Sequence, residues 1–122
     1  MRYVLDPVPK PRMTQRDKWC NRPCVVSYRY FCDAVRLMGI EIPECGAHVT
    51  FFIRMPSSWS SKKKAEMLGK PHQQKPDIDN LQKALLDALF DDDSHIWDLK
   101  CSKRWGEFGS IKLEVNDGKS DC

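Results

Sequence analysis

The sequence predicts an α+β domain with a mixed or antiparallel sheet, and two kinds of segment lead to this class. Several short segments alternate apolar and polar residues, as half-buried strands do. Other segments have helix caps or apolar residues at helical spacing. Their order along the chain is strand, helix, strand, helix, helix, strand, strand, which is typical of the α+β class. The length of 122 residues suits one core, so we take residues 1–122 as a single domain.

The N-terminal half is predicted to contain two strands and a helix. Residues 1–9 favour a short strand that ends at its prolines, and the polar, basic residues 10–23 favour a loop. Residues 25–39 are predicted to form a helix with Gly39 as its C′ residue. We expect its buried residues to include Tyr28, Phe31, Val35 and Leu37. Residues 48–56 alternate as a strand does, with one face formed by Val49, Phe51, Ile53 and Met55.

The C-terminal half is predicted to contain two helices and a β-hairpin. Residues 57–70 have a Ser cap, helix formers and a break at Gly69, and residues 72–76 form a linker. The clearest helix is residues 77–90, with a core side that we expect to consist of Ile78, Leu81, Ala84, Leu85, Ala88 and Leu89. Residues 94–105 and 110–116 alternate and have glycines between them. We therefore expect them to pair as a β-hairpin, with Trp97 in the sheet core.

Charge is distributed unevenly along the chain, although the net charge is only +3. Up to Pro76 there are 14 basic and 6 acidic residues, whereas from Asp77 onward there are 6 basic and 11 acidic residues. A basic portion suits a polyanion and an acidic pocket suits a divalent metal, so nucleic acid plus metal is the first hypothesis. No apolar run approaches the ~20 residues of a membrane span, and residues 1–20 lack a secretory segment. We therefore expect a cytoplasmic protein with reduced thiols.

The helix over residues 77–90 starts with two aspartates on either side of an isoleucine. Asp77 occupies the N-cap position, and the polar face of the helix carries Asp79, Asn80, Lys83 and Asp87. A purely structural interpretation is a cap, an Asp79–Lys83 pair and a solvated face. Three features favour a metal site instead: basic residues precede the helix, Lys83 lies one turn from Asp79, and a second cluster, Asp91–Asp93, precedes a strand. Carboxylates from two elements match the oxygen ligands of Mg²⁺, an ion that assists phosphodiester hydrolysis.

The acidic segment also resembles a known family. "KPDIDNLQKALLDAL", followed by "DDSHIWD" and by Lys103, resembles the RusA family of Holliday junction resolvases. The resemblance implies a homodimeric, Mg²⁺-dependent endonuclease that binds four-way DNA junctions and nicks two strands symmetrically. It places the metal ligands on Asp77, Asp79 and Asp93 and the essential lysine on Lys83. It also implies a phage or prophage origin. Whether Mg²⁺ or Mn²⁺ is the physiological ion stays open.

The connection between the acidic helix and the second cluster is shorter than in that family. At ~1.5 Å per residue, Asp79 to Phe90 spans about 16 Å along a helix, whereas residues 91–93 return at most about 10 Å. Either the helix ends early or the partner subunit supplies the third carboxylate. Asp91, Asp92 and Asp93 all remain candidates for that ligand, with Asp93 favoured by its spacing to Asp98. The rival function is a DNA-binding module with the same fold and a disabled metal site.

The remaining polar and aromatic residues yield weaker expectations. We expect the DNA backbone to be held by Lys10, Arg12, Arg16, Lys18, Arg22, Lys62, Lys63, Lys64, Lys70 and Lys75. Packing is favoured over base stacking for Trp19 and Trp59, and a surface position is favoured over catalysis for His95. Zinc is disfavoured, because the spacing of the candidate ligands is unlike that of zinc knuckles; these ligands are Cys20, Cys24, Cys32 and Cys45.

Overall fold

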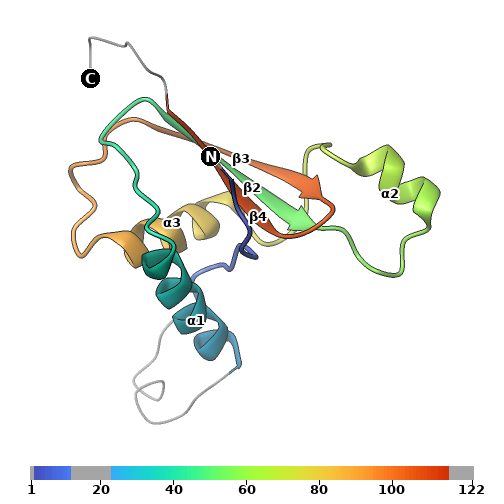
Figure 1. The fold of residues 1–122 in the computed structure, drawn as a ribbon, viewed down its shortest axis with the longest axis horizontal. Helices are drawn as coiled ribbons and strands as arrows, with labels where there is room; N and C mark the ends of the chain where they lie inside the picture. Colours follow the sequence, from blue (N-terminus) through green and yellow to red (C-terminus); the bar gives the residue numbers. More distant parts are fainter. Residues whose placement is uncertain (1, 12–22, 116–122) are drawn as a thin grey trace.

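The computed structural model of the protein describes residues 2–11 and 23–115. These residues form three helices and a four-stranded mixed sheet (Figure 1). In chain order the elements are β1 (Arg2–Tyr3), α1 (Pro23–Leu37), β2 (Ala47–Arg54), α2 (Ser61–Met67), α3 (Ile78–Leu89), β3 (Leu99–Gly106) and β4 (Ser110–Val115). The predicted α+β class and the predicted order of elements are both confirmed. The first strand is shorter than predicted.

The predicted β-hairpin of the last two strands is wrong. The strand order is β1-β4-β2-β3, so β2 lies between β3 and β4, parallel to β3 and antiparallel to β4. The chain after Gly106 therefore crosses the end of β2 before it returns as β4. This arrangement satisfies the backbone groups of β2 on both of its edges, and β2 is the strand with the most buried side chains.

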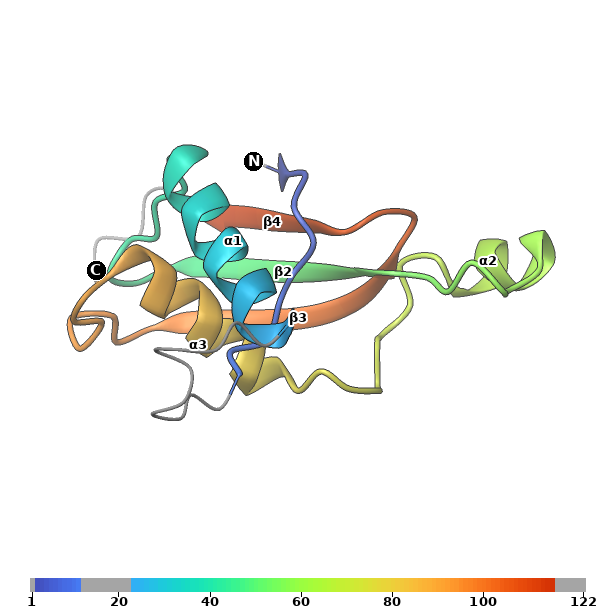
Figure 2. The same ribbon diagram turned by 90° about the horizontal axis from the view of Figure 1, so that it is seen from below.

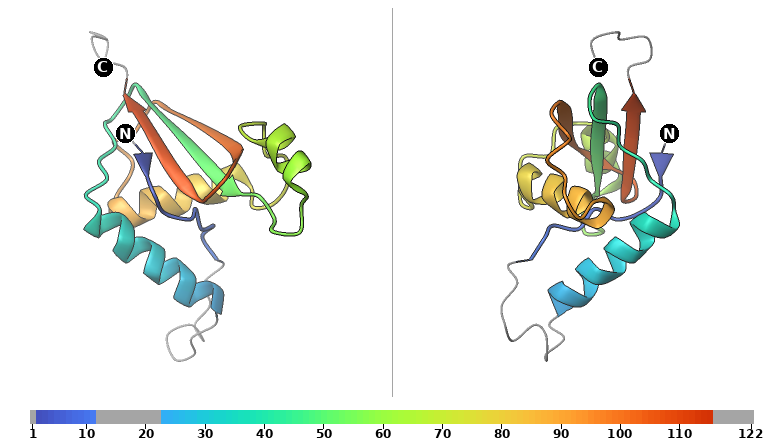
Figure 3. Two further views of the ribbon diagram at one scale, coloured as in Figure 1. Left: turned by 45° about the vertical axis from the view of Figure 1, so that its right-hand side comes forward. Right: turned by 90° about the vertical axis from the view of Figure 1, so that its left-hand side faces the viewer.

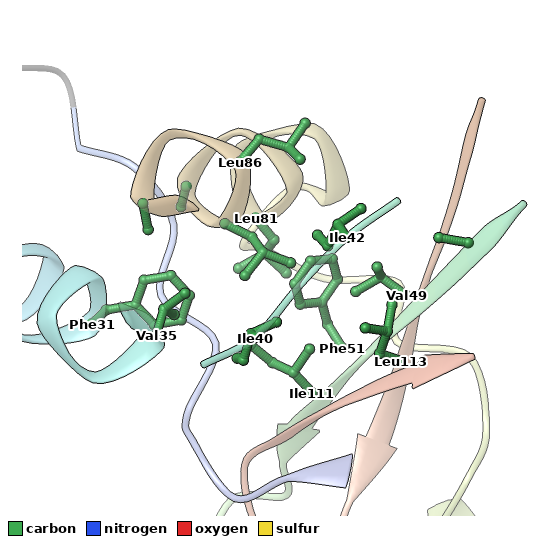
Figure 4. Close-up of a cluster of buried hydrophobic side chains, with 14 of the residues drawn as sticks. Phe31, Val35, Ile40, Ile42, Val49, Phe51, Leu81, Leu86, Ile111 and Leu113 are labelled. Atoms are coloured by element: carbon green, nitrogen blue, oxygen red, sulfur yellow. The ribbon is translucent and has the colours of Figure 1, made fainter. Parts of the chain in front are cut away.

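The helices α1 and α3 cover one face of the sheet, as Figures 2 and 3 show, and α2 lies beyond the end of the sheet. The core lies between these two helices and the strands (Figure 4). Its largest fully buried side chains include Phe31 of α1, Leu81 and Leu85 of α3, Phe51 of β2 and Ile111 of β4. Apolar spacing in each element therefore predicts the core well. None of the helices in the described ranges is long and apolar enough to cross a membrane.

Three predicted core positions are exposed. Leu37 ends α1 and is 91 % exposed, because it lies about 200° around the helix from the buried Val35 and faces away from the core. Trp97 is 64 % exposed and lies in the connection before β3, where its backbone N–H donates to the carbonyl of Glu44. The apolar alternation thus starts before the strand does. Ile78, at the first turn of α3, is also exposed, whereas Leu86 is buried against expectation.

Candidate active site at the start of α3

The two aspartates at the start of α3 are both exposed and lie within one helical turn. Asp77 is the N-cap residue by its extended backbone, but its side chain makes no capping hydrogen bond, so that expectation is wrong. Asp79 forms no ion pair with Lys83, which is exposed on the same helix. The purely structural interpretation of this face therefore fails at both of its predicted interactions, although the face is solvated as that interpretation expects. The carboxylates of Asp77 and Asp79 and the ammonium of Lys83 are available to a ligand.

Other aspartates of the acidic region have structural partners. Asp87 forms an ion pair with Lys10, which is half-buried. Asp98 accepts a hydrogen bond of 2.9 Å from the backbone N–H of Gly46. Asp92 accepts one of 3.0 Å from the N–H of Ser94, and this bond lowers the pKa of the Asp92 carboxyl. Within the part of the chain that the structure describes, the two aspartates that open α3 have no such partner.

Lys103 of β3 holds the backbone that leads into α3. Its ammonium donates to the carbonyl oxygens of Gln74 and Pro76, each at 2.6 Å. In the sequence, Lys103 stands out only through the family resemblance, which assigns it no role. A structural signal was present, since Lys103 interrupts the face of β3 that otherwise carries Cys101 and Trp105. A cation on a core-facing position needs acceptors, and here two backbone carbonyls supply them.

The segment before Gln74 is bound along the free edge of β3. Main-chain hydrogen bonds run from Trp105 N–H to the Lys70 carbonyl at 2.9 Å and from His72 N–H to the Lys103 carbonyl at 3.1 Å. The guanidinium of Arg104 donates to the carbonyl of Gly69 at 2.8 Å. The sheet edge thus determines where the first turn of α3 starts, and with it the positions of the two free carboxylates.

An aromatic cluster beside this segment contains a buried histidine. His72 is 4 % exposed, and its ring centroid lies 4.3 Å from that of Trp105. Burial and, to a smaller degree, the charge of Lys103 lower the pKa of His72. The ring of Trp59 lies 4.8 Å from Trp105 and has the ammonium of Lys63 above it at 4.3 Å. This agrees with the expectation that Trp59 packs.

The basic residues expected to hold DNA lie at several places in the structure. Lys10 is next to α3, because its N–H donates to the carbonyl of Asn80 at 3.4 Å and its ammonium contacts Asp87. Lys70 and Lys75 are exposed before α3, and α2 carries Lys62 and Lys63, both exposed, and Lys64, half-buried. Several predictions lie outside the described residues, namely those for Arg12, Arg16, Lys18, Arg22 and Trp19.

The third carboxylate is not brought to the first two within one chain. Helix α3 continues to Leu89, so it does not end early. Asp93 instead lines an open pocket of about 360 Å³ together with Gln82 and Leu86, further along α3. Across residues 2–11 and 23–115, no three His, Cys, Asp or Glu side chains gather closely enough to hold a metal. Asp91 is exposed, as is His95, whose ring meets the Phe90 ring edge-on at 4.9 Å.

The cysteines differ in their chemical state. Cys45 is disulfide-bonded, so the expectation of reduced thiols is wrong for this residue and its sulfur is not a candidate zinc ligand. Cys32 and Cys101 are free, and burial raises the pKa of the Cys101 thiol to about 11. The predictions for the sulfurs of Cys20 and Cys24 lie outside the described residues.

The fold and this site define an α+β protein with two exposed carboxylates at a helix N-terminus and lysines around them. The family model of endodeoxyribonuclease RusA matches residues 6–116, so the chain belongs to the RusA family. Membership implies an endodeoxyribonuclease of the Holliday junction resolvase type, with branched DNA as the substrate. No curated protein and no solved structure matches the chain.

Proposed function

We propose that the protein is a homodimeric, Mg²⁺-dependent endonuclease that binds four-way DNA junctions and nicks two strands symmetrically. The observation that carries the proposal is the pair of exposed carboxylates at the start of α3, Asp77 and Asp79, neither of which has a bonded partner among residues 2–11 and 23–115. Two like charges within one turn repel each other, and a bound divalent cation removes that repulsion. Membership of the RusA family supports DNA as the substrate.

The side chains at this site fit Mg²⁺ by their chemistry, and a third ligand would come from outside the chain. Asp77 and Asp79 offer the carboxylate oxygens that Mg²⁺ prefers, and Mn²⁺ is the alternative ion. Asp93 is the proposed third ligand, and the continuous α3 helix supports its supply by the second subunit. When bound, the cation supplies positive charge that offsets the charge developing on the scissile phosphate.

The other residues of the site have distinct proposed roles. Lys83 lies one turn after Asp79 and is exposed, so its ammonium can stabilise negative charge on the phosphate in the transition state. Lys103 positions the first turn of α3 through its two carbonyl contacts. The DNA backbone is held by the basic segment that starts at Lys10 and by the lysines of α2 and of the connection before α3, which gives salt-sensitive binding.

The test is nicking of a synthetic four-way junction in the presence and absence of Mg²⁺. Asp79→Asn should abolish nicking and leave junction affinity unchanged or higher, because a negative charge near the phosphates is lost. Asp33→Asn, which changes an exposed aspartate on α1, is the matched control and should cut like the wild type. If Asp79→Asn is folded but no longer binds junctions, its carboxylate has another role.

The rival function is a module that binds DNA without cutting it. The separation of Asp93 from the first two aspartates is the observation that favours it. Tight junction binding by the wild type, with no nicking in Mg²⁺ or Mn²⁺, would establish this rival and reject the endonuclease.

A further inference from the structure

The sheet has a second face on which no helix of the described residues packs (Figures 2 and 3). Alternation and strand register determine which residues lie on it. Thr50 of β2 is paired with Ser102 of β3 and with Lys112 of β4, and Lys112 is paired with Arg2 of β1. The neighbouring positions Val49 and Phe51 face the helices and are fully buried. We call this second face the open face and define it by its charged residues, Arg2, Arg54, Lys100, Arg104, Lys112 and Glu114.

The open face is strongly basic. Its strands carry five cations and one carboxylate, all six exposed, and Glu107 in the turn between β3 and β4 adds a second carboxylate at the edge near Arg2. Among the described residues, none of the basic side chains assigned above to DNA lies on it. The cations come from all four strands, so the charge is spread over the face and is not confined to one loop.

Three of the five cations are held in place by the structure. The guanidinium of Arg2 lies 4.4 Å from the centre of the Phe52 ring. Arg104 donates to the carbonyl of Gly69, and Lys112 forms an exposed ion pair of 3.4 Å with Glu114. Lys100 has no partner within the described ranges. Cations that are already ordered lose little side-chain freedom when an anion binds.

We propose that the open face binds the phosphate backbone of a duplex arm of the DNA substrate, an inference that rests on the proposed function. From Lys100 to Arg104 the strand extends about 13 Å, the length over which one DNA strand presents about four phosphates. A second copy of the chain fits poorly. A two-fold contact through this face would oppose five cations to five cations. Duplex DNA has the opposite charge over a comparable length.

The experiment compares two double variants. Lys100→Gln with Lys112→Gln removes two charges, whereas Lys100→Arg with Lys112→Arg keeps them as the matched control. Both residues are exposed, so neither variant disturbs the core. Affinity for a duplex and for a four-way junction is measured as a function of salt, and acetylation of each lysine is measured with and without DNA. We expect the Gln variant to lower the salt slope by about 1.8 and to bind DNA roughly 10- to 100-fold more weakly at 0.1 M salt.

DNA should also protect Lys100 and Lys112 of the wild-type protein from acetylation. An unchanged slope without protection, in a protein that still binds and nicks junctions, overturns the open-face proposal and leaves the proposed function standing. A reduced slope and protection, in a wild-type protein that binds junctions but does not nick them, would support the open-face proposal and reject the proposed endonuclease function. If, without DNA, protection of Lys100 and Lys112 from acetylation grows with protein concentration, the open face binds a second copy and the proposal is overturned. If the protein binds anionic lipid vesicles and not DNA, the open face binds a membrane surface and the proposal is likewise overturned.

Discussion

Replacing Lys103 with methionine should weaken both the fold and the activity, because one ammonium anchors the backbone on the N-terminal side of Asp77. Methionine keeps most of the aliphatic stem and removes the two donors to Gln74 and Pro76. A hydrogen bond from a charged donor contributes about 1.5–3 kcal/mol net. Water can replace the contact at exposed Gln74, so we expect a loss of about 1.5–3 kcal/mol, mostly from the partly buried contact at Pro76.

The effect on cleavage should exceed the effect on binding. If the first turn of α3 moves by about 1 Å, single-turnover nicking should slow by about 10²-fold, while junction affinity changes little. Urea denaturation measures the stability, and nicking is measured well below the unfolding midpoint of every variant. Hydrogen exchange should rise at the Leu81 amide, which donates to the Asp77 carbonyl at 3.2 Å.

Two control variants accompany this prediction. Lys103→Arg keeps the charge and the donors and should restore part of the nicking rate, which a loss of packing alone does not predict. Lys100→Met changes an exposed lysine of the same strand and should leave stability near that of the wild type. Wild-type stability and wild-type nicking in Lys103→Met would refute the anchoring role.

Three further predictions concern Lys83, the third carboxylate and His72. Lys83→Ala should slow nicking by about 10²-fold or more without loss of junction affinity, and a wild-type rate would show that its ammonium does not act on the phosphate. Asp77→Asn and Asp93→Asn should each be inactive alone. After subunit exchange, a mixed dimer has one intact shared site and should nick one strand. Confirmed exchange without nicking would place the whole site within one chain. The pKa of His72 is lowered in the folded protein, so below about pH 6.5 the unfolded chain binds protons more readily than the folded protein. The free energy of unfolding should therefore decrease as the pH is lowered, by up to about 1.4 kcal/mol per pH unit. Urea denaturation of His72→Phe near pH 7.5 and near pH 5.5 should not show this decrease. An equal change in the free energy of unfolding between the two pH values, in His72→Phe and in the wild type, would contradict the prediction.

The sequence alone determined the local elements and the candidate ligands. Helical spacing in α3 identified Leu81, Ala84, Leu85 and Ala88 as core residues, and all four are buried. The class and the order of elements also follow from periodicity, because burial on one side imposes a period of about 3.6 on helices and 2 on strands. The D-x-D pair was recognisable for a similar reason, since its two carboxylates and its cap position are adjacent in the chain.

Tertiary structure alone decided which distant segments meet. Strand pairing places β2 between β3 and β4, although turn signals favoured a hairpin, because local signals contain no information about which strand enters the sheet between two others. The contacts of Lys103 with Gln74 and Pro76 and of Lys10 with Asp87 join residues 27 to 77 positions apart, beyond the reach of any periodicity. Asp93 illustrates the same point: its place beside Gln82, away from Asp77, depends on α3 remaining helical to Leu89. Packing of that last turn, through buried Leu86 and Ala88, separates the carboxylates within one chain.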